Sequence, residues 1–148
     1  MFDEKIANGK INDYVANKLE DERVFEMLQS EKIESLKASI EDIQEAIKQR
    51  KQLSEEMITL MNKIIIDTDN FVIRLGSLSD NKDNELIRGE QMKLRQKQVE
   101  IEAMKVQEKL NCWRDIAQLK KELREHLREY RERESRSTML DSLLAGED

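Results

Sequence analysis

The sequence predicts an all-α protein: an elongated coiled coil of two long helices, joined by a short loop and completed by partner helices. Three observations carry this prediction. The 148 residues contain no proline and only four glycines, and apolar residues recur every three or four positions. Proline interrupts helices because it lacks an amide hydrogen and clashes with the preceding turn. Charged residues make up 39% of the chain and aromatic residues 4%, which favours a narrow apolar seam over a globular core.

Residues 1–12 are predicted to form a short mobile or docking segment. The Asn8-Gly9 pair is typical of a turn. A helix is expected to follow, with Asn12 or Asp13 as its N-terminal cap.

The first long helix is predicted over residues 13–75. Apolar residues in its middle follow steps of three and four, the a/d alternation of a heptad repeat. They are Ile33, Leu36, Ile40, Ile43 and Ile47. The same frame then places Arg50 and Ser54 in the seam, before apolar residues return. These are Met57, Met61, Ile64 and Phe71. A local phase change would join this frame to a shifted one that starts at Leu53.

Residues 76–84 are predicted to be the loop. Gly76 stands where a helix C-terminus favours glycine. Asp80, Asp83 or Asn84 could cap the next helix. The loop is long enough to reverse the chain into a hairpin, and a bent, continuous rod is the alternative.

The second long helix is predicted over residues 85–136, where several apolar stripes drift in phase. One stripe consists of Ile87, Leu94 and Ile101; a second of Val99, Ala103, Val106, Leu110, Trp113 and Ala117; and a third includes Ile116, Leu119, Leu123 and Leu127. Such a wide apolar surface fits a three- or four-helix bundle. Trp113 either fills a gap in the bundle or anchors a partner.

Residues 137–148 are predicted to be an acidic C-terminal tail. The tail contains an LxxLL pattern formed by Leu140, Leu143 and Leu144. An LxxLL segment can dock as a helix into an apolar groove, and a frayed amphipathic helix end is the alternative.

Neither an enzyme nor a cofactor or metal site is expected. His126 and Cys112 are the only residues of their kinds, and no glycine-rich phosphate loop is present.

The net charge of −6 and the glutamates interleaved with the basic residues of 120–136 argue against a nucleic-acid surface. No signal peptide or transmembrane segment is recognisable. We therefore expect an intracellular, cytoplasmic or cytoskeletal protein without a small-molecule substrate.

The predicted function is that of a non-catalytic scaffold or adaptor subunit in a hetero-oligomeric assembly of other coiled-coil subunits. Cytoskeletal, ciliary, centrosomal, kinetochore and vesicle-tethering assemblies are candidate settings. The interrupted heptads favour an unlike partner over a homodimer. A homodimeric spacer and a regulator of nucleic-acid transactions, acting through the basic C-terminal helix, are the alternatives. The expected partner-binding residues are Ile33, Leu36, Ile40, Ile43, Ile47, Met57, Met61, Ile64, Phe71, Leu110, Trp113, Leu123, Leu140, Leu143 and Leu144.

Overall fold

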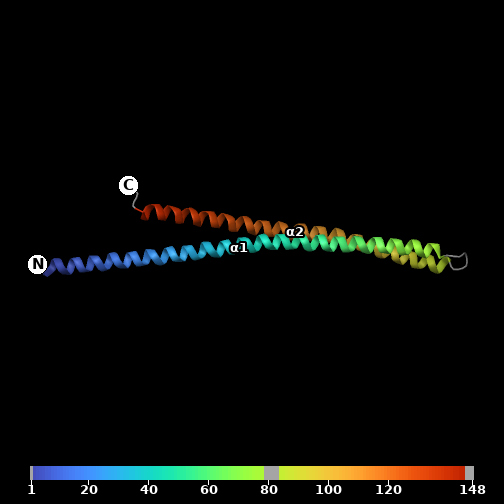
Figure 1. Ribbon diagram of the computed structural model, residues 1–148, viewed down its shortest axis with the longest axis horizontal. Helices are drawn as coiled ribbons and strands as arrows, with labels where there is room; N and C mark the ends of the chain where they lie inside the picture. Colours follow the sequence, from blue (N-terminus) through green and yellow to red (C-terminus); the bar gives the residue numbers. More distant parts are fainter. Residues whose placement is uncertain (1, 79–83, 146–148) are drawn as a thin grey trace. The chain divides into compact units, whose positions relative to one another are not determined.

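The protein folds into two long α-helices, as the sequence predicts. The computed structural model describes residues 2–78 and 84–145, with side chains at 10–78 and 85–145. Helix α1 spans Phe2–Ser77 and helix α2 spans Asn84–Leu144 (Figure 1). No strand occurs among the described residues.

The chain divides into two units, and in each one a segment of α1 packs against a segment of α2. The loop-proximal unit is Gln44–Lys121, and the terminal unit is Met1–Ile43 with Glu122–Asp148. In the loop-proximal unit, Arg50 bonds to Asp115 and Asp69 bonds to Arg95, so the residue numbers rise along α1 as they fall along α2. The two segments are therefore antiparallel. The hairpin, and not the bent rod, is the arrangement found.

Covered side chains recur along both helices with steps of three and four, and we call these two rows the seam. On α1 the seam comprises Ile33, Leu36, Ile40, Ile43, Ile47, Arg50, Ser54, Met57, Met61, Ile65, Thr68, Val72 and Leu75. On α2 it comprises Ile87, Gln91, Leu94, Gln98, Ile101, Lys105, Glu108, Cys112, Ile116, Leu119, Leu123, His126, Tyr130, Arg133, Ser137 and Leu140. The heptad frame that places Arg50 and Ser54 in the seam is thus the correct one.

The phase change of the heptad frame occurs further along α1 than the sequence predicts. Two consecutive steps of four join Met57, Met61 and Ile65, and the seam continues to Val72. Ile64 and Phe71 are 40% and 52% exposed, so they lie outside the seam that α2 covers. The physical reason is helical drift, because an extra step of four returns the row to the same side of the helix.

Both helices are longer than predicted. Helix α1 begins at Phe2, not near residue 13, and runs through Asn8-Gly9. A single glycine inside a helix costs only about 1 kcal/mol relative to alanine, too little to stop a long helix. Helix α2 continues to Leu144 and not to residue 136, so most of the predicted tail is helical.

The predicted loop is shorter at both ends. Helix α1 continues through Gly76 to Ser77, and the Ser77 hydroxyl donates to the Arg74 carbonyl at 2.8 Å. Asn84 opens α2, whereas the other cap candidates, Asp80 and Asp83, lie outside the described residues.

Gly76 has a packing role that differs from the predicted cap. A Cβ atom at this position would lie 3.1 Å from the Nε2 of Gln91. The same Gln91 amide donates to the Val72 carbonyl at 3.1 Å. Glycine therefore leaves room for a side chain of α2 that bonds to the backbone of α1.

Candidate helix-binding interface

The seam face of α2 is unusually polar in the loop-proximal unit. Gln91, Gln98 and Lys105 stand seven residues apart within it. The Gln98 amide donates to the Ile65 carbonyl at 3.0 Å, and the Lys105 ammonium donates to the Asn62 side chain at 2.7 Å. Every buried side-chain nitrogen and oxygen in the described part of the chain has a hydrogen-bond partner. Polar contacts thus join the two helices at these positions, between apolar seam residues of both helices.

One ion-pair network lies within this seam. The Nη1 of Arg50 donates to Glu108 at 2.6 Å, and its Nε donates to Asp115 at 2.9 Å. The side chains of Arg50 and Glu108 are only 18% and 10% exposed. The hydrogen bonds to Glu108, and then to Asp115, raise the pKa of Arg50 above its usual range. The network favours one register, since a slide of one turn, about 5.4 Å, would separate these groups.

A continuous apolar row on α2 lies outside the seam, and we call it the outer stripe. Its members are Val99, Ala103, Val106, Leu110, Trp113 and Ala117, with steps of four and three throughout. All six are exposed; Trp113 is 74% exposed and Leu110 is 53% exposed. At about 100° per residue, the outer stripe lies about 140° around α2 from the seam. Helix α1 therefore cannot cover it.

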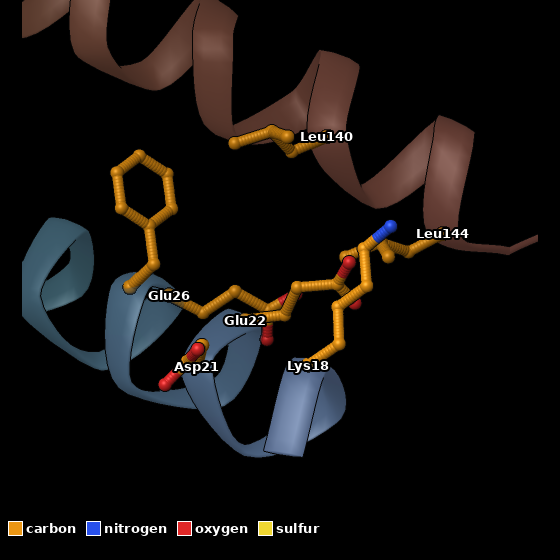
Figure 2. A pocket seen from close by; sticks show the side chains of 7 residues that line it. Lys18, Asp21, Glu22, Glu26, Leu140 and Leu144 are labelled. Atoms are coloured by element: carbon orange, nitrogen blue, oxygen red, sulfur yellow. The ribbon is translucent and has the colours of Figure 1, made fainter. Parts of the chain in front are cut away.

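The terminal unit has an open groove between its two helix segments. Figure 2 shows Lys18, Glu22 and Glu26 on α1 and Leu140 and Leu144 on α2. The groove has a volume of about 250 Å³, and Phe25 and Asp21 complete its lining. Three of the seven lining residues are apolar and three are carboxylates.

Helix α1 extends past the end of α2 in this unit. Lys18 lines the groove together with Leu144, the last residue of α2. On the N-terminal side of Lys18, the side chains of Ile11 and Tyr14 are 59% and 67% exposed. An apolar surface of α1 therefore continues where α2 has ended.

The expected partner-binding residues fall into two groups. The covered residues are Ile33, Leu36, Ile40, Ile43, Ile47, Met57, Met61, Leu123 and Leu140. The exposed residues are Ile64, Phe71, Leu110, Trp113, Leu143 and Leu144. The first group packs within the chain, and the second remains accessible to another molecule. The LxxLL leucines are divided between them, with Leu143 75% exposed.

Sequence reasoning missed the polar seam residues of α2. The signal was a second seven-residue repeat, with Gln91, Gln98 and Lys105 each four residues after Ile87, Leu94 and Ile101. Four and three are the steps of a single heptad row, so these polar residues share the face of the apolar ones.

The two residues considered for catalysis both lie on the seam. The Nδ1 of His126 is 2.8 Å from the Glu122 carbonyl oxygen, and Cys112 is half-buried. Within residues 2–78 and 84–145, no group of three or more His, Cys, Asp or Glu side chains is placed to hold a metal ion. Neither helix, over its described residues, has a segment long and apolar enough to cross a membrane.

Comparisons with known proteins give no match, whether to a family model, to a curated protein or to a solved structure.

Proposed function

We propose that the chain is a non-catalytic scaffold or adaptor subunit of a hetero-oligomeric intracellular assembly, and that it binds other helices through its uncovered apolar surfaces. One observation carries the proposal. Among the described residues, only two apolar side chains are buried: Ile40, which is 8% exposed, and Val72, which is 5% exposed. Large apolar residues are exposed on both helices, including Leu28, Leu60 and Trp113.

This imbalance limits the stability of the hairpin on its own. A fully buried Val or Ile side chain stabilises a fold by about 1.5–3 kcal/mol. Ordering each backbone residue costs about 1–2 kcal/mol. Helical hydrogen bonds and partly covered seam residues offset part of this cost, but the exposed apolar residues contribute little until something covers them. A partner helix would supply that cover.

The terminal unit is the surface we assign to the unlike partner. A partner helix would follow the groove and continue over Ile11 and Tyr14, where α2 has ended. Asp21, Glu22 and Glu26 line the groove, so the partner should carry lysine or arginine beside its apolar row. Cytoskeletal, ciliary, centrosomal, kinetochore and vesicle-tethering assemblies are the settings suggested by architecture alone.

The experiment that tests this proposal uses two leucines of nearly equal exposure on α1. Leu28 in the terminal unit is 52% exposed and lies seven residues after the groove residue Asp21, on the same face of α1, whereas Leu53 in the loop-proximal unit is 51% exposed. A tagged chain is isolated from cells of its source after lysine cross-linking, and stoichiometric partners are identified by mass spectrometry. We expect Leu28→Glu to lose the partner and Leu53→Glu to keep it. A wild-type chain with no stoichiometric partner would contradict the proposal.

A further inference from the structure

We propose that two copies of this chain pair antiparallel through the outer stripe of α2. This inference goes beyond the proposed function, because it concerns the loop-proximal unit and a second copy, whereas the unlike partner is assigned to the terminal unit. The outer stripe has six exposed positions in an unbroken row of fours and threes. The row extends over about 27 Å at 1.5 Å per residue, about five helical turns.

Side-chain size selects the antiparallel direction. The outer stripe contains both the largest side chain of the protein, Trp113, and two alanines. In a parallel pair, Trp113 would face the Trp113 of the other copy, and each alanine would face the equivalent alanine. The two tryptophans would clash in one layer, and the alanines would leave voids in two others. A two-fold axis between Val106 and Leu110 instead places a larger residue against a smaller one in every layer. The facing pairs, each occurring twice, are Val106 with Leu110, Trp113 with Ala103, and Val99 with Ala117.

The charges beside the outer stripe agree with the same direction. Glu100, Gln107 and Arg114 form one flank, spaced by seven residues, and all three are exposed. In the antiparallel register, Glu100 of each copy faces Arg114 of the other, and Gln107 faces itself. On the second flank, Lys109 faces the Lys109 of the other copy. The antiparallel register therefore contains two attractive Glu100–Arg114 pairs and one repulsive contact between like charges. In a parallel pair, flanking residues five apart would meet, so the two contacts of Arg95 with Glu100 would be offset by two like-charge contacts of Lys109 with Arg114.

Charge and size complementarity therefore point to the same occupant and the same register. Binding of an unlike helix would not require the residues at one end of the outer stripe to complement those at its other end. The self-complementarity of this row about its centre is the property that an isologous, two-fold interface requires.

The direction is tested by cross-linking in a Cys112→Ser background, which leaves no native thiol. Glu100→Cys and Arg114→Cys variants are prepared separately, and a short bis-maleimide is added to each alone and to their mixture. We expect the 100–114 cross-link in the mixture only, identified by peptide mass spectrometry. Efficient cross-linking of either variant with itself would overturn the proposal, as would a mixture that forms no cross-linked dimer.

The contact itself is tested by sedimentation of the purified chain. Leu110→Glu on the outer stripe is compared with Leu53→Glu, a leucine of similar exposure that lies outside it. We expect Leu110→Glu to raise the dissociation constant at least tenfold, and Leu53→Glu to change it less than threefold. Equal effects of the two substitutions would overturn the proposal, as would a wild-type chain that is monomeric throughout.

Exchanging the flanking charges provides a second, gentler perturbation. Glu100→Arg should weaken the dimer, and the double variant Glu100→Arg/Arg114→Glu should restore it. A double variant weaker than the single one would overturn the assigned register. These measurements use the purified chain without other proteins, so their failure would leave the Leu28→Glu result on the unlike partner unaffected, and the reverse also holds.

Discussion

Glu108 provides the sharpest test of how the two helices are held together. Glu108 is buried, at 8% exposure for the residue, and its carboxylate accepts a hydrogen bond of 2.6 Å from Arg50. Replacing Glu108 with alanine leaves the Arg50 guanidinium inside the seam with Asp115 as its remaining partner. We expect this substitution to destabilise the hairpin clearly.

The magnitude follows from what Arg50 loses and keeps. A hydrogen bond to a charged group contributes about 1.5–3 kcal/mol, and removing one partner of a buried ion pair costs more. Arg50 keeps the bond to Asp115 and is 18% exposed, so water can reach part of it. The expected loss for Glu108→Ala is therefore near the lower end of that range, about 1.5–2 kcal/mol.

Glu90→Ala is the matched control. Glu90 also lies on α2 and also forms an ion pair, to Lys93 at 3.4 Å, but its side chain is 56% exposed. Exposed ion pairs contribute about 0–1 kcal/mol, and the change in helix propensity is the same for both substitutions. Urea unfolding followed by circular dichroism measures both at one chain concentration. A Glu108→Ala variant within about 0.5 kcal/mol of Glu90→Ala would refute the assigned role of the network.

Three further predictions concern the same hairpin. Arg50→Lys should be less stable than the wild type, because an ammonium cannot present the two separate donors that reach Glu108 and Asp115; urea unfolding measures the difference. Ile40→Ala should cost about 2–4 kcal/mol in the same assay, and Ile66→Ala, at a position 59% exposed, less than 1 kcal/mol; equal losses would contradict the seam. Gly9→Ala should raise the helical signal and stabilise α1 by up to about 1 kcal/mol, whereas a loss of helicity would restore the predicted turn.

The heptad frame could be predicted from the sequence over much of α1. Steps of three and four from Ile33 to Met61 follow from the helical period, and they assign even Arg50 and Ser54 correctly. The frame is ambiguous at Ile64-Ile65-Ile66, where three consecutive residues are apolar. Only the position of α2 decides which of the three is covered.

The polar half of the seam could not be predicted in the same way. Gln98 and Gln91 are tolerated there because they donate to carbonyl groups of α1, and those contacts depend on the register of the two helices.

The ends of the helices were also predicted wrongly. Turn signals such as Asn8-Gly9 are worth about 1 kcal/mol, and a helix of 76 residues outweighs them.

The apolar surfaces could be predicted from the sequence more easily than what covers each of them. The row containing Leu110 and Trp113 is visible in the sequence as a second stripe, but hydrophobic spacing does not distinguish a surface covered by the same chain from one left open. The exposure of Trp113, 74%, makes that distinction.

The central claim is that this hairpin needs other helices to cover its apolar surfaces, and thermal unfolding over a hundredfold dilution series tests it most directly. Circular dichroism would follow the unfolding, and light scattering coupled to gel filtration would give the mass at each concentration. Because association stabilises only the folded state, the account predicts a mass above the 17.5 kDa of one chain and a midpoint that rises with concentration. A monomer with a cooperative, concentration-independent midpoint would contradict it.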